Sequence, residues 1–494
     1  MQLKVTDIDI SSGGPLIAIL NIEDALKLDL HTLDRVKITS NSKSIICSVD
    51  ISETKVKKGH IGLFKEVLSL LKVKNNSVLN IHPDQKPKSI EFIRKKLDGY
   101  KLNKNEIFEI VRDITLNRLT EPELTYFISA IYINKLSLQE NIELIKAIVK
   151  NGKTLNLKGK IYDIHSTGGI PGNKVTMIVV PIIAAAGLKI PKTSSRAITS
   201  ASGTADTMEV LCKVDFTAKE IESIVKKTNG CIVWGGSQDL ASADDKLIKI
   251  EHPLSLDPEN ILLASILSKK LSVRTNNLLL EIPYSKEIKI KTKQKALYLK
   301  KRFLQITKKL GIKTKIIIAD GSQPIGNGIG PNLEARDVLD ILMNKKDAPN
   351  DLRQKSLHLA SLLLEMAKIK NPYETATKIL NSGLAYKKFR EIIKAQKGNP
   401  NIKSQNLKLG KYKLKFKAYK PGKVIDINNN LVFKICRLLG SPVHKGSGIY
   451  FYVHENDLLK KNQLIFTVYA ETKEDFKDVK NFISKNTLKK LVNI

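Results

Sequence analysis

The stretch from residue 160 to residue 188 constrains the fold of this chain more than any other. A short apolar run, KIYDIH, leads through a glycine-rich turn, STGGIPGN, into the apolar sequence TMIVVPIIAAAG. This order is typical of a strand, a loop and a buried helix. Two further apolar runs, GCIVWG and KTKIIIADG, have the pattern of buried strands between helices. Such alternation of strands and helices predicts an α/β core.

The regions before this core follow different patterns. Among the first 84 residues, turn residues bound the runs LKVTDIDI, PLIAILNI, DRVKITS and SIICSVDI, which predicts a small β-rich domain. A linker containing Pro83 and Pro87 follows. From Ile90 to Val149 apolar residues then recur at helical spacing, which predicts a helical domain.

Composition narrows the classes of function. The chain has 494 residues, enough for roughly three domains. Its 83 basic and 49 acidic residues give a net charge of +34, which favours anionic partners such as nucleotides, phosphate, nucleic acid or anionic membranes. The two most basic stretches, 286–315 and 387–417, carry few aromatic residues for base stacking, so nucleic-acid binding is not favoured as the main function.

Cysteine spacing and the N-terminus indicate the compartment. The four cysteines are scattered, and the eight histidines are isolated, so we expect free thiols in a reducing compartment and no metal site. The N-terminus lacks an apolar signal region, and the longest apolar run, 177–188, is shorter than the roughly 18–20 residues of a membrane helix. We therefore expect a soluble, cytoplasmic protein.

The glycine-rich turn at 166–173 is the first candidate for chemistry. Glycines let the backbone approach a ligand closely, and the N–H groups at a helix start attract anions. Ser166 and Thr176 add hydroxyl groups beside it. The spacing fits neither a P-loop nor GxGxxG. Taken alone, a glycine-rich turn between a strand and a helix is more often only a turn than a ligand site.

Two more segments carry candidate residues. Seven of the fifteen residues in 192–206 bear hydroxyls, with Arg196 among them, a composition that suits a phosphate or sugar contact as well as a polar surface loop. Asp257, followed by Pro258, has the pattern of a helix N-cap. In the helix that follows, Ser265 and Lys269 stand four residues apart and share one face, which contacts either ligand or solvent.

Together these segments resemble the thymidine phosphorylase/AMP phosphorylase family, the second class of nucleoside phosphorylases. SSRAITSASGTADTMEVL resembles the family signature, HSTGGIPGN its phosphate loop, and ASILSKKL its base-side helix. IIADGSQPIGNGIGPNLEARDVL resembles a further family block, so the match runs from about residue 85 to the C-terminus. The extension before it, with DIDI and LDRVKI, is similar to that of the AMP phosphorylase branch.

The resemblance implies an α/β fold. A helical domain and a large mixed α/β domain are expected to bind substrates in a cleft between them, after a small β-rich N-terminal domain. The expected boundaries are 1–84 for the β-rich extension, 85–155 with 241–272 for the helical domain, 156–240 with 273–420 for the phosphate-binding α/β domain, and 421–494 for a C-terminal α/β subdomain.

The resemblance also implies site residues. Asp257 is expected to be the proton donor. Contacts to the nucleotide or phosphate are expected from Gly169, Ser195, Arg196, Ala197, Ile198, Thr199, Ser200, Thr204, Ser265 and Lys289. Three hydroxyl residues are expected near the attacking phosphate: Ser166, Thr176 and Ser194.

The function that the resemblance favours is phosphorolysis of AMP to adenine and ribose 1,5-bisphosphate. The alternative is phosphorolysis of thymidine to thymine and deoxyribose 1-phosphate. A further alternative is a non-catalytic nucleotide-binding member, because Ile164 stands where the family's phosphate loop has a lysine. No cofactor or metal is expected beyond phosphate as co-substrate, and the expected assembly is a homodimer or larger homo-oligomer with no membrane or nucleic-acid partner.

Overall fold

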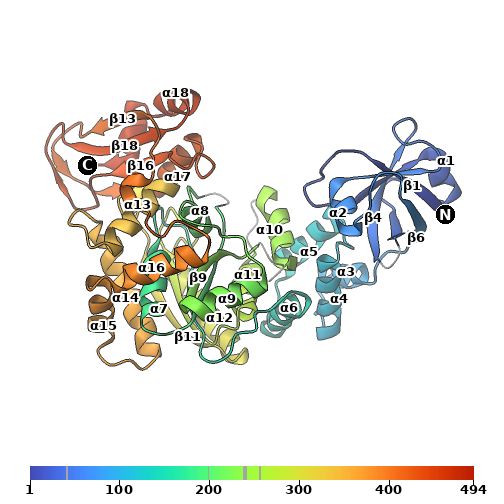
Figure 1. The fold of residues 1–494 in the computed structure, drawn as a ribbon, viewed down its shortest axis with the longest axis horizontal. Coiled ribbons are helices and arrows are strands. Elements are labelled where there is room, and N and C mark those ends of the chain that lie inside the picture. The colour runs from blue at the N-terminus through green and yellow to red at the C-terminus, as the bar shows by residue number, and fades with distance from the viewer. Residues whose placement is uncertain (41–42, 198–199, 237–241, 255–257) are drawn as a thin grey trace. The chain divides into compact units, whose positions relative to one another are not determined.

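The computed structural model describes residues 1–40, 43–197, 200–236, 242–254 and 258–494 (Figure 1). The chain forms two compact units. The first contains Met1–Gly152 and Ala241–Ile266, and the second contains Lys153–Leu240 and Leu267–Ile494. The chain therefore passes from one unit to the other three times, the last time within a single helix over Glu259–Ser272.

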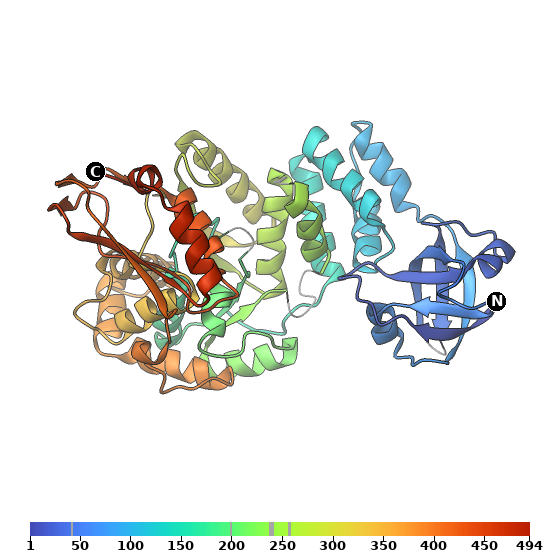
Figure 2. The same cartoon turned by 90° about the horizontal axis from the view of Figure 1, so that it is seen from above.

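The N-terminal part of the first unit is a closed six-stranded barrel, drawn in blue in Figure 2. The strands pair in the order β1-β5-β2-β4-β3-β6. Side chains alternate between core and solvent, so that Leu3, Val5, Val36 and Ile38 are buried. The sequence predicted four of these strands, and the structure adds β5 and β6, which close the barrel. The elements are β1 (Gln2–Asp7), β2 (Ile17–Asn21), α1 (Ile22–Lys27), β3 (Arg35–Ser40), β4 (Lys43–Ser52), β5 (His60–Leu63), α2 (Lys65–Leu71) and β6 (Val78–Asp84).

Helices form the rest of the first unit. Ser137 and Glu140 form a capping box at the start of the helix Leu138–Asn151, which satisfies backbone N–H groups of its first turn. Asn260 joins the returning segment to these helices, because its Oδ1 accepts from the Leu136 N–H at 3.0 Å and its carbonyl accepts from the Asn141 amide at 2.9 Å. The helices are α3 (Ser89–Leu97), α4 (Lys104–Thr115), α5 (Glu121–Asn134), α6 (Leu138–Asn151), α10 (Ser242–Leu254) and the start of α11 (Glu259–Ser272).

The second unit is built on parallel strands. The strands β11 (Lys313–Asp320), β10 (Asn277–Tyr284) and β7 (Tyr162–Ser166) form one sheet in that order, and β8 (Ile190–Ser194) pairs with β9 (Gly230–Trp234). A parallel bridge between Ile161 and Lys189 links the two groups. All five strands therefore run in the same direction, as the α/β prediction requires.

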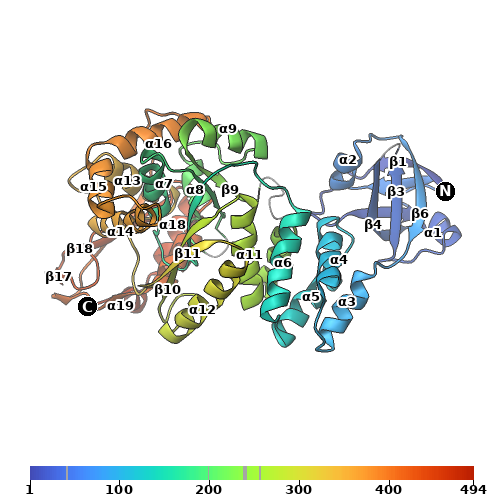
Figure 3. The ribbon, with the colours of Figure 1, turned by 90° about the horizontal axis from the view of Figure 1, so that it is seen from below.

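Helices cover both faces of these strands, as Figure 3 shows for α7 and α16 on one side and α12 on the other. Ile164, Ile232 and Leu279 lie in one apolar core with α7 (Val175–Ala185) and with side chains of the helices within residues 331–395. The opposite face of β10 and β11 packs against α12 (Lys293–Lys309). Within the described residues, none of the helices combines the length and apolar character that a membrane crossing demands. The remaining helices of this part are α8 (Thr204–Glu209), α9 (Ala218–Thr228), α13 (Pro331–Leu342), α14 (Asn350–Met366), α15 (Pro372–Asn381) and α16 (Leu384–Ala395).

The C-terminal part of the second unit has its own antiparallel sheet and core. The sheet order is β12-β16-β18-β13, so it includes residues 328–329 and 412–417, ahead of the boundary expected at 421. Its strands are β12 (Gly328–Ile329), β13 (Tyr412–Lys417), β16 (Gly448–Phe451) and β18 (Leu464–Ala470). Two short pairs, β14 (Gly422–Lys423) with β17 (Leu458–Leu459) and β15 (Asp426–Ile427) with β19 (Val492–Asn493), and three helices, α17 (Asn429–Leu438), α18 (Lys473–Phe482) and α19 (Lys485–Leu491), complete it.

Candidate functional site

The parallel strands of the second unit end at a common carboxyl edge. Open parallel sheets bind ligands outside this edge, in the loops that follow the strands. The predicted site residues of this unit stand at the ends of β7 and β8, in the loops after β7, β8 and β10, or at the start of α7 and α8. The five strands end at Ser166, Ser194, Trp234, Tyr284 and Asp320.

The glycine-rich loop after β7 is shaped by its glycines. Gly168 and Gly169 have φ values of 86° and 99°, a region that other residues rarely adopt. A Cβ atom on Gly169 would lie 2.9 Å from Cβ of Ile288, whereas one on Gly168 would meet nothing within 4 Å. The Thr167 N–H donates to the Glu281 carbonyl on β10 at 3.0 Å, which fixes the start of the loop. The loop therefore packs directly on the segment that carries Lys289.

A carboxylate anchors the segment that carries Lys289. Glu287 accepts from the Asn429 N–H at 2.8 Å and from the Asn428 side-chain amide, at the start of α17. Burial raises the pKa of this carboxyl group, and the bonds from the helix N-terminus oppose that shift. Ile288, the next residue, lies against both Gly169 and Gly321. The C-terminal subdomain thus holds the loop at 285–290 in place.

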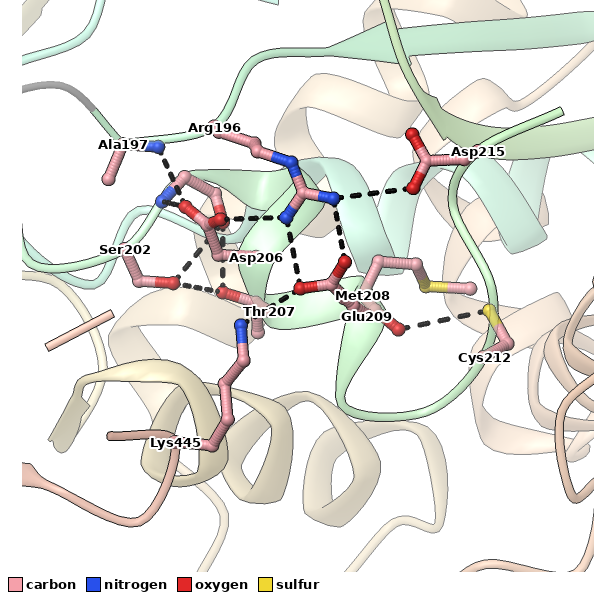
Figure 4. Close-up of polar contacts among 11 residues, drawn as sticks. Arg196, Ala197, Ser202, Asp206, Thr207, Met208, Glu209, Cys212, Asp215 and Lys445 are labelled. Carbon is pink, nitrogen blue, oxygen red and sulfur yellow. Dashed lines mark hydrogen bonds and ion pairs between the residues drawn. The ribbon is translucent and has the colours of Figure 1, made fainter. Parts of the chain in front are cut away.

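Arg196, in the loop after β8, is surrounded by carboxylates (Figure 4). Its guanidinium donates to Glu209 at 2.6 and 2.9 Å, to Asp206 at 3.3 Å and to Asp215 at 3.4 Å. It also lies 4.9 Å from the ring centroid of Trp234. These contacts raise the pKa of Arg196, chiefly through the hydrogen bond to Glu209. Arg196 was predicted to contact phosphate. In the structure, three carboxylates already engage its charge.

Glu209 receives a second cation. Lys445 donates to its Oε2 at 2.9 Å, as Figure 4 shows, and the hydrogen bond from Arg196 is the main cause that lowers the pKa of Glu209 to about 2. Asp206 folds the loop back, because its Oδ2 accepts from the Ala197 N–H at 2.7 Å and from the Gly203 N–H at 2.8 Å. The backbone N–H of Ala197 is therefore paired within the protein.

A buried polar network lies beneath this loop. Ser202 and Thr207 share a hydrogen bond of 2.8 Å, and the Thr207 hydroxyl donates to Glu334 at 2.6 Å. Glu334, which is 1% exposed, pairs with Lys174 at 3.1 Å, and Lys174 also donates to the Ser202 carbonyl at 3.2 Å. Lys174, at the start of α7, is thus engaged by a carboxylate. The network ties the glycine-rich loop, the loop after β8 and α13 together.

Hydroxyl groups near the carboxyl edge are buried without a partner. The side-chain oxygens of Thr167, Thr193 and Ser194 are inaccessible, and within the described chain they make no hydrogen bond. Buried polar groups are almost always paired in a folded protein. Three such donors close to the ends of β7 and β8 indicate a place for an acceptor-rich ligand.

Basic side chains gather around His165. Desolvation is the main cause that holds the pKa of His165 well below its usual range, and Lys270, Lys192, Lys269 and Lys289 add to the shift. Lys270 pairs with the buried carboxylate of Asp163 at 2.8 Å. The cluster therefore combines a positive potential with little water, which favours an anion.

Ile164 lies in the apolar core and not in this cluster. Its side chain is 1% exposed and packs in the core that includes Val175 and Leu279. Because isoleucine stands where the family has a lysine, β7 provides no cationic side chain at position 164. The cations of the cluster come from other elements.

The remaining predicted residues are placed as follows. Ser265 donates to Asp244 Oδ2 at 2.8 Å, within the first unit. Thr204 is the first residue of α8, and Ser200 precedes it in the same loop. Asp257, Ile198 and Thr199 lie outside the described residues.

Sequence reasoning missed several members of the site. Glu334 lies in the block GIGPNLEARDVL, which resembles the family but for which no residue role was predicted. Lys445 stands far along the chain from the loop that it supports, and Glu287, although only two residues from Lys289, has partners at the start of α17, so no local pattern marks either role. Only their hydrogen bonds to Glu209 and to the start of α17 reveal them.

The chain resembles known proteins in both of its domains. Residues 90–152 match the helical bundle domain of the glycosyl transferase family, and residues 158–386 match its α/β domain. An AMP phosphorylase from Methanocaldococcus jannaschii is 41% identical over 480 residues, which are 97% of this chain and 94% of that protein. An AMP phosphorylase from Thermococcus kodakarensis is 42% identical over 475 residues, 95% of this chain and 94% of that protein.

Solved structures show the same fold at low identity. Anthranilate phosphoribosyltransferase from Thermus thermophilus has a TM-score of 0.52 and 14% identity, covering 62% of this chain and 99% of that one. The corresponding enzyme from Saccharomyces cerevisiae, solved in complex with PRPP and Mg, has a TM-score of 0.50 and 18% identity, covering 63% and 98%.

Proposed function

The chain belongs to the AMP phosphorylase family, and we propose that it cleaves the N-glycosidic bond of AMP with phosphate, giving adenine and ribose 1,5-bisphosphate. The observation that carries the proposal is the extent of the likeness. An aligned stretch of 480 residues in a chain of 494 leaves at most 14 residues unmatched, so it includes the N-terminal barrel. The thymidine alternative has less support, because these relatives are named for AMP.

The proposed reaction needs mainly the positioning of an anion. A phosphate oxygen forms a bond to the anomeric carbon while the bond from that carbon to the base breaks, through an oxocarbenium-like transition state. Hydroxyl and N–H donors in a partly dry site can hold the phosphate for this attack. The buried, unpartnered hydroxyls of Thr167 and Ser194 and the positive cluster around His165 support such a role.

We assign the following residues to the proposed site. Ser166, Thr176 and Ser194 contact the attacking phosphate. Arg196 acts as a positioning residue that holds its loop, because three carboxylates already bind its guanidinium. The nucleotide or phosphate contacts are Gly169, Ser195, Ala197, Ile198, Thr199, Ser200, Thr204, Ser265 and Lys289.

We assign Asp257 the proton transfer to the departing base, a step for which a general acid typically contributes 10²–10⁴-fold. Asp257→Asn tests this assignment. Asparagine caps a helix about as well as aspartate does, but it cannot supply the proton. We expect turnover to fall at least about 100-fold with the thermal midpoint unchanged. Turnover and stability falling together would instead favour a purely structural N-cap.

The function itself is tested by base release. The purified protein is incubated with phosphate and, separately, with AMP, CMP, UMP, thymidine and uridine, and the free base is measured. We expect phosphate-dependent release of adenine from AMP. Release only from thymidine or uridine would overturn the choice of substrate. No release from any of them would favour a nucleotide-binding protein without turnover.

The remaining expectations belong to the same proposal. Phosphate serves as co-substrate without a further cofactor, and the protein acts in the cytoplasm as a homodimer or larger homo-oligomer. Sedimentation of the purified protein checks the assembly, and activity after treatment with a chelator checks the metal requirement.

A further inference from the structure

Lys192 is a buried lysine that has no carboxylate partner within the described part of the chain. It lies on β8, two residues before the carboxyl end of the strand, and is 4% exposed. Its ammonium donates to the Thr193 carbonyl at 2.7 Å. Among the described residues, no carboxylate lies within 4.0 Å of it, whereas Lys270 pairs with Asp163 and Lys174 pairs with Glu334.

The surroundings of Lys192 disfavour its charge. Burial is the main cause that lowers its pKa to about 7, and the neighbouring Lys270 and Lys269 add to that effect, while Asp163 opposes it. His165 faces the same group of lysines and stays neutral near pH 7, because its own pKa is held well below the usual range. A buried ammonium without a carboxylate partner costs stability.

The position of Lys192 is that of a ligand contact. Ser194 follows two residues later, on the same side of the strand by alternation, and its buried hydroxyl makes no hydrogen bond to any described residue. Counting in register from the Ile161–Lys189 bridge, Lys192 stands level with Ile164 on β7, which offers only an apolar side chain. The glycine-rich loop begins two residues beyond Ile164.

We propose that the Lys192 ammonium binds a phosphoryl group of the substrates and so contributes a cation to the anion site at this end of the sheet. The proposal rests on the proposed function, since it names the residue that holds one of its substrates. The phosphoryl group is either inorganic phosphate or the 5′-phosphate of the nucleotide. Both present the same anionic oxygens to the ammonium and to the Ser194 hydroxyl.

Two other cations of the neighbourhood are excluded from this role by their partners. Arg196 is held by Glu209, Asp206 and Asp215, and Lys174 is held by the buried carboxylate of Glu334. Neither can turn to a ligand without leaving a buried or half-buried acid unpaired. Lys192 gains a counter-ion when the ligand arrives, and it leaves no acid behind.

Calorimetry on the full-length protein tests the proposal. Binding of inorganic phosphate and of AMP is measured for the wild type, for Lys192→Met, and for Lys189→Met as the matched control. Lys189 stands just before the amino end of the same strand, and its ammonium donates to the Lys158 carbonyl at 3.0 Å. We expect Lys192→Met to weaken one of the two ligands about tenfold or more, as loss of a charge-assisted hydrogen bond does, and Lys189→Met to change neither.

The identity of the weakened ligand distinguishes the two sources of the phosphoryl group. Loss for phosphate alone assigns Lys192 to the co-substrate, and loss for AMP alone assigns it to the 5′-phosphate. Both affinities within twofold of the wild type would overturn the proposal while leaving the proposed function intact. A wild type that binds neither ligand and releases no adenine would overturn both.

Proton uptake provides a readout that a structural role would not give. At pH 8 the free Lys192 is largely neutral, so binding an anion to the ammonium must draw a proton from the buffer. Titrations in two buffers of different ionisation enthalpy measure this uptake. We expect uptake in the wild type and its loss in Lys192→Met, each compared at the same pH so that the titration of the phosphate cancels. Lys192→Gln, with a polar and neutral tip, repeats the test in case the methionine variant does not fold, and equal uptake in all variants would overturn the proposal.

Discussion

Ile288 occupies the space that a side chain on Gly169 would need. A Cβ atom at Gly169 would lie 2.9 Å from Cβ of Ile288, and Cδ1 of the same isoleucine lies 2.6 Å from where a Cβ of Gly321 would be. One apolar side chain thus holds together the loops after β7, β10 and β11. The arrangement of the carboxyl edge depends on the absence of side chains at two glycines.

Gly169→Ala is expected to disturb this contact, with Gly168→Ala as its matched control. Both glycines have positive φ, so each substitution costs about 1 kcal/mol of backbone strain, but only Gly169 meets Ile288. We expect Gly169→Ala to lose about 3 kcal/mol in total, with a higher KM for phosphate. Denaturant unfolding and initial rates measure the two effects.

The double variant Gly169→Ala/Ile288→Gly isolates the contact itself, because only glycine at residue 288 removes the Cβ atom that a new Cβ at residue 169 would meet. If the clash with Ile288 is the cause, the two substitutions should interact, and the double variant should recover part of the lost stability. Equal losses in Gly168→Ala and Gly169→Ala, with no interaction in the double variant, would show that backbone strain alone is responsible.

Glu287→Ala is expected to release the loop that carries Lys289. The carboxylate accepts two hydrogen bonds at the start of α17, and bonds to a charged group contribute about 2 kcal/mol. We therefore expect KM for phosphate to rise about tenfold with a smaller change in kcat. Lys286→Ala, one residue earlier and exposed, serves as control. Similar kinetics for the two variants would argue against an anchoring role.

Glu209 makes a pH-dependent contribution to stability. The hydrogen bond from Arg196 lowers its pKa in the folded protein to about 2, below the value of 4.5 for an unperturbed glutamate. Such a group stabilises the fold above pH 4.5, and that contribution disappears as the pH falls toward 2. The difference in unfolding midpoint between the wild type and Glu209→Gln should therefore be largest near pH 7 and shrink by pH 3.

A charge-matched variant controls for the change in net charge. Glu474→Gln removes the same charge from an exposed position on α18. Its midpoint should stay close to that of the wild type at both pH values. A difference for Glu209→Gln that stays constant from pH 7 to pH 3 would show that the ion pair with Arg196 is not its source.

Lys192 destabilises the fold at neutral pH, whereas Glu209 stabilises it. The pKa of Lys192 is about 7 in the folded protein and 10.5 for an unperturbed lysine, so between these values the unfolded chain binds more protons than the folded one. Stability contributed by this group must therefore rise with pH from about 7 to about 10. We expect Lys192→Met to be more stable than the wild type at pH 7, with the gap narrowing at pH 9. Denaturant titrations at both pH values measure it, and a gap that widens with pH would contradict the assignment.

Local patterns in the sequence determined the classes of element and most of the loops that carry chemistry. Alternation of polar and apolar residues predicted β1 to β4, and apolar runs bounded by turns predicted β7, β9 and β11, because burial of one face imposes its period on the chain. The glycines of the loop after β7 marked a turn for a different reason, since the positive φ values there favour glycine.

The tertiary structure alone decided which charges are free to act. Lys174, Lys192 and Arg196 all stand in or beside the loops of the carboxyl edge, and no local sequence pattern distinguishes their roles. Glu334, which is 160 residues from Lys174 along the chain, engages Lys174, and the acids at 206, 209 and 215 engage Arg196. An ion pair depends on which groups the fold brings within about 4 Å, and that distance is set by the packing of α8, α13 and the strands. Among the residues that the structure describes, no carboxylate lies within 4.0 Å of the Lys192 ammonium, because the fold pairs the neighbouring Asp163 with Lys270.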